Sequence, residues 1–219
     1  MNLELTERLL NKTCAYYFVM VTRYFLSDED IDKLSAFSRD VVSKGQNPKS
    51  FLSQTRTTEQ QEIDSFRGKA VEIILCRILD ENNIYHGEID WEVGKGAFGL
   101  TRDSGVDIFV GSSKISINAT GPKDRLLLIP TYKFNAHENI GVTHLVLGTV
   151  PKENPKYVDM DGFISLYEFK MRKTLFEKNG YLGLYTNNYG ILKTELYDNW
   201  NIFKGISLQE FLLLPSKNV

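Results

Sequence analysis

The stretch of sequence that decides the fold is Asp103-Ser-Gly-Val-Asp107-Ile-Phe-Val-Gly-Ser-Ser-Lys114-Ile-Ser116-Ile-Asn118-Ala-Thr-Gly-Pro122. Apolar residues, many of them β-branched, flank a Gly-Ser-Ser segment that is typical of a tight turn. This pattern predicts a hairpin with strands near residues 105–110 and 113–119. Asp107 falls in the first strand, and Ser116 and Asn118 fall in the second. Because side chains alternate along a strand, Ser116 and Asn118 are expected on the same side of the sheet.

A carboxylate interrupts an apolar helical pattern upstream of this hairpin. A helix is predicted from about residue 58 to 82, with Thr58 and Gln61 as a possible capping box. Within it, the segment Arg67-Gly-Lys-Ala-Val-Glu72 places Glu72 among apolar residues. Burial of a carboxylate is costly unless the group is paired or lies near a cation. Glu72 is therefore a candidate site residue.

The segments after this helix indicate a mixed α/β sheet. The patterns predict, in order, strands near 84–92 and 97–101, the hairpin, an apolar run at 126–129, a loop holding Pro130 and the polar stretch 135–139, a buried central strand at 144–150, a short element at 163–164, a basic helix at 168–178, strand or turn at 180–192 and a terminal helix at 207–214. Helices before a sheet, followed by a further helix and strand, are typical of the α/β class.

The first quarter of the chain is predicted to be helical. Residues 3–26 have helical periodicity, and Ser27 followed by three acidic residues predicts the N-cap of a second helix ending near Lys44-Gly45. The polar segment 50–58 is predicted to be a linker. We therefore expect a helical N-terminal lobe at 1–57 and an α/β core at 58–219.

Composition limits the classes of function that the chain can serve. The 219 residues carry a formal net charge of −2, and 42% are hydrophobic, as in ordinary globular domains. Since the chain is not basic as a whole, a nucleic-acid surface has to be a local basic patch or has to be assisted by metal ions. Cys14 and Cys76 are expected to be buried, reduced thiols. The N-terminus lacks a basic segment, and the apolar stretch 14–21 is too short to span a bilayer, so we expect a cytoplasmic protein without a membrane anchor.

Residues 60 to 215 together resemble the PD-(D/E)XK nuclease superfamily, which includes type II restriction enzymes. The resemblance rests on Glu72, the hairpin, the strand 143–150 and the segment Asp161-Gly-Phe-Ile-Ser-Leu-Tyr-Glu168-Phe. It implies a restriction-endonuclease-like mixed central sheet flanked by helices. In that family a helix glutamate precedes a hairpin of the form GVD…(D/E)xK. The aspartate and second acid bind one or two Mg²⁺ ions, and the lysine orients or activates the attacking water.

Each family position can be carried over to one residue of this chain. Glu72 matches the helix acid and Asp107 the hairpin aspartate, while Ile117 would offer its backbone carbonyl to the metal. Ser116 falls on the second acid, and Asn118 falls on the lysine. The implied cofactor is Mg²⁺ or Mn²⁺, and the implied activity is hydrolysis of DNA by an endonuclease of restriction or phage-defence type, as a homodimer if both strands of a palindrome are cut.

Phosphate contacts are assigned to the basic residues that flank this hairpin. Lys114, Lys123 and Arg125 could grip the DNA backbone, and they could equally be solvated hairpin ends.

The two departures from the family motif leave three interpretations of the site. It is an atypical active site with Glu72 and Asp107 as metal ligands, a degenerate site, or a site in which Asn118 is an introduced substitution that stops cleavage. Asparagine is neutral and supplies no positive charge near the attacking water. The alternative function is that of a catalytically inactive nuclease fold that binds DNA or a protein.

Simpler roles exist for both candidate metal ligands. Asp107 could pair with Arg102 or Arg125. Glu72 could form a salt bridge with Lys69, one helical turn away, or with Arg77.

Overall fold

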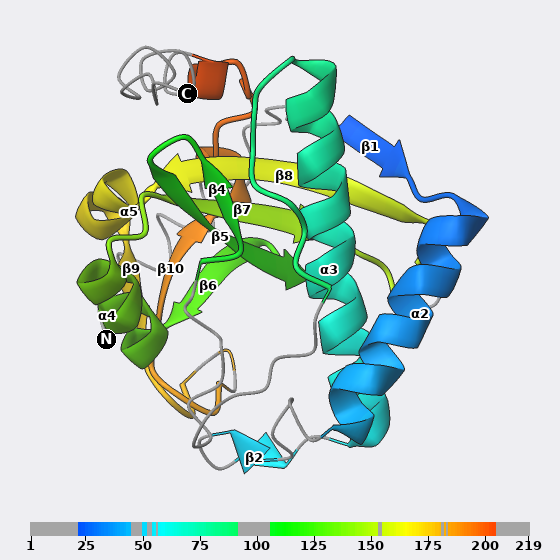
Figure 1. Cartoon of the computed structure of the whole chain (residues 1–219). Coiled ribbons are helices and arrows are strands. Elements are labelled where there is room, and N and C mark those ends of the chain that lie inside the picture. Colours follow the sequence, from blue (N-terminus) through cyan, green and yellow to red (C-terminus); the bar gives the residue numbers. More distant parts are fainter. Residues whose placement is uncertain are drawn as a thin grey trace.

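The computed structural model describes residues 22–44, 50–51, 54–55, 57–91, 106–152, 155–180, 182 and 184–204. The elements within these ranges follow one another along the chain as Figure 1 shows. They are β1 (Thr22–Phe25), α2 (Asp28–Ser43), β2 (Ser50–Phe51), β3 (Gln54–Thr55), α3 (Thr58–Glu81), β4 (Ile108–Val110), β5 (Ser113–Thr120), β6 (Leu126–Pro130), α4 (Thr131–Ile140), β7 (His144–Thr149), β8 (Tyr157–Ser165), α5 (Leu166–Arg172), β9 (Thr174–Phe176), β10 (Asn188–Leu192) and the 3-10 turn η2 (Lys193–Glu195).

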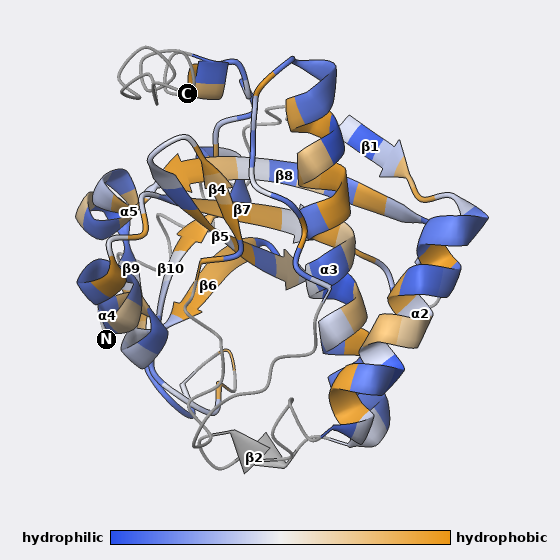
Figure 2. Ribbon diagram, in the orientation of Figure 1, coloured by the Kyte–Doolittle hydropathy of each residue, from blue (hydrophilic) through white to orange (hydrophobic). Residues whose placement is uncertain are grey.

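A mixed five-stranded sheet forms the centre of the fold, with the strand order β1-β8-β7-β5-β4. β5 and β7 run parallel, and the other neighbouring pairs are antiparallel. The predicted buried strand at 144–150 is confirmed as β7, which lies in the middle of the sheet and is buried along nearly its whole length. Its apolar character is visible in Figure 2, where β7 is largely orange, while α2 alternates between blue and orange. A second sheet has the order β6-β10-β9.

Helices cover both faces of the central sheet. One core cluster joins α3 to the side chains of Ile115, Ile117 and Val146. The other cluster joins Leu145 and Leu147 to α4, α5 and the second sheet. Figure 1 accordingly shows α3 and α2 on one side and α4 and α5 on the other. The expected fold class, an α/β protein with a mixed central sheet flanked by helices, is confirmed.

α3 is the helix that brings Glu72 to the sheet. Thr57 caps its N-terminus, since the hydroxyl accepts from the backbone N–H of Gln60 at 3.1 Å. The cap is thus one residue earlier than predicted. From Ala70 to Leu79 nearly every residue is buried, because the sheet covers one side of α3 and α2 covers another. Such a helix has little amphipathic periodicity, and a charge within it needs a local partner.

α2 confirms the predicted second helix and its cap. Ser27 and Asp30 form a capping box, and the C-cap is Lys44. Asp30 also binds the Arg77 guanidinium at 2.6 Å, which ties the start of α2 to α3. Leu34 is fully buried in the same core cluster as α3. The helical part of residues 22–44 therefore packs on the core itself, and the domain boundary at residue 57 stays a prediction.

Two predicted elements are wrong in type. Residues 22–25 were expected to end a helix, but they form β1, which pairs with β8 from Thr22↔Met160 to Phe25↔Tyr157. The open edge of β8 outweighs a helical periodicity that is weak over four residues. The stretch after Pro130 was expected to be a loop, but it forms α4, which ends at Gly141 with φ 73°. Within α4 only Phe134 and His137 are buried, so its sequence is mostly polar.

Smaller differences concern the ends and lengths of elements. The element at 163–164 is the nine-residue strand β8, and the basic helix ends at Arg172 before β9. The predicted linker at 50–58 contains the paired strands β2 and β3. Residues 84–91 form no strand, although Gly87 N–H donates to the carbonyl of Phe109 at 2.8 Å. The predictions at 3–21, 97–101 and 207–214 lie outside the described residues.

In the parts of the chain that the structure describes, no helix is both long and apolar enough to cross a bilayer.

Candidate functional site

Glu72 lies in a buried position on α3 and is paired with a lysine. Its side chain is 6% exposed, and the Lys69 ammonium, whose side chain is 12% exposed, lies 2.5 Å from Oε2. Of the two simple partners expected for Glu72, Lys69 is thus the one observed, while Arg77 binds Asp30. Burial raises the pKa of Glu72 to about 7, against the opposing charge of Lys69. The charge of Asp107, and then that of Asp90, raises this pKa further.

Asp107 lies one residue before β4, rather than within a strand as predicted. The backbone N–H of Ile117 donates to Asp107 Oδ2 at 2.6 Å, and the N–H of Asp107 donates to the carbonyl of Ile115 at 2.8 Å. These bonds fix the carboxylate beside the second half of β5. Since its charge also acts on Glu72, the two acids that the family motif implies share one electrostatic environment.

Ser116 and Asn118 lie on the face of the sheet opposite α3. Their register partners on β7 are Leu145 and Leu147, which belong to the core cluster of α4 and α5. The prediction that the two share a side agrees with this register. Ser116 is fully buried, and its Oγ shares a hydrogen bond of 3.3 Å with Nε2 of His137 on α4, which is also fully buried. Ser116, which falls on the second acid of the family motif, therefore faces a closed core.

Asn118 has an amide nitrogen that nothing in the described structure satisfies. Its Nδ2 is buried and has no hydrogen-bond partner among the described residues. A buried donor without an acceptor costs about 1–3 kcal/mol, so such groups are uncommon in folded proteins. At the position that the family gives to lysine, this residue thus brings no charge, and its amide nitrogen has no acceptor among the described residues.

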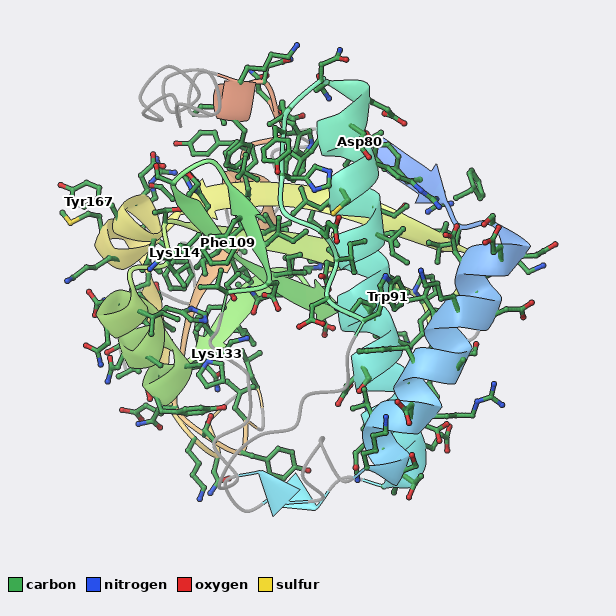
Figure 3. The ribbon with its side chains drawn as sticks, viewed as in Figure 1. Asp80, Trp91, Phe109, Lys114, Lys133 and Tyr167 are labelled. Atoms are coloured by element: carbon green, nitrogen blue, oxygen red, sulfur yellow. The ribbon has the colours of Figure 1, made fainter. Side chains whose placement is uncertain are left out.

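Lys69 is a charged residue of the site that the hairpin sequence does not indicate, because it lies on α3. Its ammonium donates to the carbonyl of Asp90 at 2.9 Å in addition to binding Glu72. It also lies 5.1 Å from the ring centre of Phe37 on α2 and 5.8 Å from that of Trp91, which Figure 3 places between α2 and α3. The only signal for it in the sequence is its spacing of three residues from Glu72, which indicated a plain salt bridge.

The three basic residues expected to hold phosphate have different surroundings. The Lys114 ammonium donates to the carbonyl of Ile140 at 2.7 Å, where it stabilises the C-terminal end of α4. Figure 3 shows Lys114 on the side of the hairpin toward α4 and α5. Lys123 and Arg125 are exposed in the turn after β5. They remain predicted phosphate contacts.

Arg67 is a further basic residue near this turn. A Cβ placed on Gly121 would lie 3.6 Å from its Nη2, so the guanidinium lies beside the turn that follows β5. Its Nε is buried and has no acceptor among the described residues. α3 therefore places Arg67 beside the turn after β5, on the same helix as Lys69 and Glu72.

A divalent cation is chemically compatible with these groups. No three His, Cys, Asp or Glu side chains are grouped as an ion cage within the described ranges. Mg²⁺ does not require such a cage, since one or two carboxylates together with waters and substrate phosphate oxygens commonly bind it. The desolvated carboxylate of Glu72, under the negative charge of Asp107, is a group whose ionised form a cation would stabilise.

Comparison with known proteins adds no relative: no protein-family model matches the chain, and no curated protein sequence matches it significantly.

Proposed function

We propose that the protein is a Mg²⁺- or Mn²⁺-dependent endonuclease that hydrolyses DNA phosphodiesters, with Glu72, Asp107 and the carbonyl of Ile117 as the groups that hold the metal. The observation that carries this proposal is the buried carboxylate of Glu72, whose pKa is raised to about 7 by burial and by Asp107 and Asp90. Strongly perturbed carboxylates that interact with one another are concentrated at functional sites.

The residues of this chain would divide the work of such a site. A bound divalent ion supplies a water of lowered pKa and stabilises charge on the phosphoryl group. Asp107 is held by the N–H of Ile117, so its carboxylate has a fixed position before any ligand binds. Lys123, Arg125 and Arg67 surround the turn after β5 and would position phosphates without reading sequence.

The test is cleavage of supercoiled plasmid DNA with Mg²⁺ or Mn²⁺, using methylated and unmethylated substrates. We expect nicked or linear product from the wild-type protein and none from Asp107→Ala. Asp161→Asn is a matched control, because Asp161 is also a buried carboxylate paired with a lysine, but lies outside the site. An absence of cleavage with either metal on every substrate would rule out an active enzyme.

A second candidate, a non-catalytic DNA- or protein-binding module, is favoured by a different observation. Ser116 is committed to His137 in a closed core, and Asn118 offers no charge. This candidate predicts DNA binding, measured by fluorescence anisotropy, that is unchanged in Asp107→Ala and is not accompanied by cleavage. Loss of binding in that variant at retained thermal stability would count against it.

A further inference from the structure

A nuclease site needs positive charge close to the reacting phosphate, and position 118 supplies none. The phosphoryl group carries negative charge through the reaction, so a fixed cation beside it lowers the barrier. Asn118 is neutral, and its side chain lies on the face of β5 opposite α3. Any such cation must therefore come from another element.

Three lysines anchored by contacts within the structure are Lys69, Lys114 and Lys193, and two of them bind groups outside the candidate site. The Lys114 ammonium binds the carbonyl of Ile140 at the C-terminal end of α4. Lys193 binds Asp161 at 3.0 Å and also donates to the Thr149 hydroxyl, which lies at the end of β7. Neither of these ammonium groups contacts Glu72.

The third, Lys69, contacts the candidate site directly. Its Nζ lies 2.5 Å from Glu72 Oε2 and 2.9 Å from the carbonyl oxygen of Asp90. An ammonium group has three N–H donors, and these two contacts use two of them. The aromatic rings of Phe37 and Trp91 lie within 5.1 and 5.8 Å and restrict the side chain further.

We infer that Lys69 is the catalytic cation of this site, in place of the charge that position 118 lacks, and that its remaining N–H binds an oxygen of the scissile phosphate. The inference rests on the proposed function. In the reaction, the oxygen of water forms the new bond to phosphorus and its proton passes to solvent. The bond from phosphorus to the leaving sugar oxygen breaks, and that oxygen takes a proton from solvent. Lys69 stays protonated and stabilises the phosphoryl oxygens.

The inference is tested by single-turnover cleavage with Lys69→Met and Lys69→Gln. Lys193→Met is the matched control, because it removes a lysine of similar burial from a carboxylate outside the site. We expect both Lys69 variants to lose at least about 100-fold in cleavage rate, as when one charge-stabilising group is removed from an active site. Lys193→Met should stay within threefold of wild type at a temperature where all variants are folded.

A second readout separates a catalytic role from a structural one. Mn²⁺ affinity is measured by electron paramagnetic resonance at a pH well above the pKa of Glu72, where this carboxyl is ionised in both proteins. It should be unchanged or tighter in Lys69→Gln, because a positive charge beside Glu72 is lost. A fall in Mn²⁺ affinity as large as the fall in rate would show that Lys69 acts only by holding Glu72, and would overturn the catalytic assignment.

The two proposals fail in distinguishable ways. A wild-type protein that cleaves no DNA overturns the proposed function and Lys69 with it. A wild-type protein that cleaves, while both Lys69 variants cleave at the rate of Lys193→Met, overturns the Lys69 assignment alone.

Discussion

Two buried lysine–carboxylate pairs on this fold differ in the charges that surround them. Lys69–Glu72 lies on α3, and Lys193–Asp161 joins η2 to β8. Their exposures are similar, at 12% and 6% for the first pair and 17% and 7% for the second. In both pairs burial raises the pKa of the acid, and the lysine opposes that rise.

The difference lies in the neighbouring acids and hydrogen bonds. Asp161 also accepts from the Thr149 hydroxyl at 2.7 Å, and its nearest acidic neighbour, Asp159, is paired with Arg23 at 2.7 Å. The charges of Asp107 and Asp90 both raise the pKa of Glu72, and the charge of Lys69 lowers it. The Asp161 pair is therefore neutralised locally. The Glu72 pair lies in the field of two further carboxylates, and such a field favours a bound cation.

The largest expected effect that separates the two pairs is on cleavage. Glu72→Gln removes a proposed metal ligand and should lower the plasmid cleavage rate at least about 100-fold, since even supporting residues of a metal site contribute 10–100-fold. Asp161→Asn should leave the rate unchanged at a temperature where it is folded. Equal losses in both variants would mean that the two pairs serve the same structural purpose.

The second expected effect is on the stability that the Lys193–Asp161 pair contributes. Lys193→Met leaves the Asp161 carboxylate buried without its lysine partner. Breaking a buried pair in this way costs about 3–5 kcal/mol in unfolding free energy. Urea unfolding at pH 7.5 measures this loss. A cost below about 1 kcal/mol, the range of surface pairs, would show that Lys193–Asp161 is not a structural ion pair.

The pH dependence of stability should report the raised pKa of Glu72. Its pKa rises from 4.5 in the unfolded chain to about 7 in the folded protein. The unfolded state therefore releases this proton first, and stability falls as the pH rises from about 4.5 to about 7, by at most roughly 3.4 kcal/mol at 1.36 kcal/mol per pKa unit. Urea unfolding across this range should show the decline in wild type but not in Glu72→Gln. The same decline in both proteins would assign it to other groups.

The smallest effect is expected at Ser116. Ser116→Ala removes one hydrogen bond to His137 in the closed core, which should cost about 1 kcal/mol in unfolding free energy. Cleavage should be unaffected, because this hydroxyl faces away from α3. A large loss of cleavage without loss of stability would place Ser116 in the site after all.

The sequence was most informative where local chemistry and tertiary structure agree. The caps of α2 and α3, the hairpin and the buried strand β7 follow from patterns within a few residues. Glu72 and Asp107 could be identified as candidate site residues from the sequence, because a carboxylate among apolar residues is costly to bury without a partner. β1 could not be predicted, since its strand conformation comes from pairing with β8, more than 130 residues away.

The rest of the candidate site depends on which face of the sheet each residue meets. α4 has only Phe134 and His137 as buried residues, so its sequence resembles that of a loop. This helix closes the face that holds Ser116, and no pattern in the hairpin indicates it. Lys69 likewise acquires its significance only when α3 packs along β5 and brings it near Asp90.

The central claim, that Glu72 and Asp107 form a cation site, is tested most directly by Mn²⁺ binding in the presence of a DNA duplex, whose phosphate oxygens would complete the coordination. Electron paramagnetic resonance titrations should be run on wild type, Asp107→Ala and Asp161→Asn at pH 7.5. The account predicts a DNA-dependent Mn²⁺ site in wild type and in Asp161→Asn that disappears in Asp107→Ala. The same binding in all three proteins, or none in wild type, would contradict it.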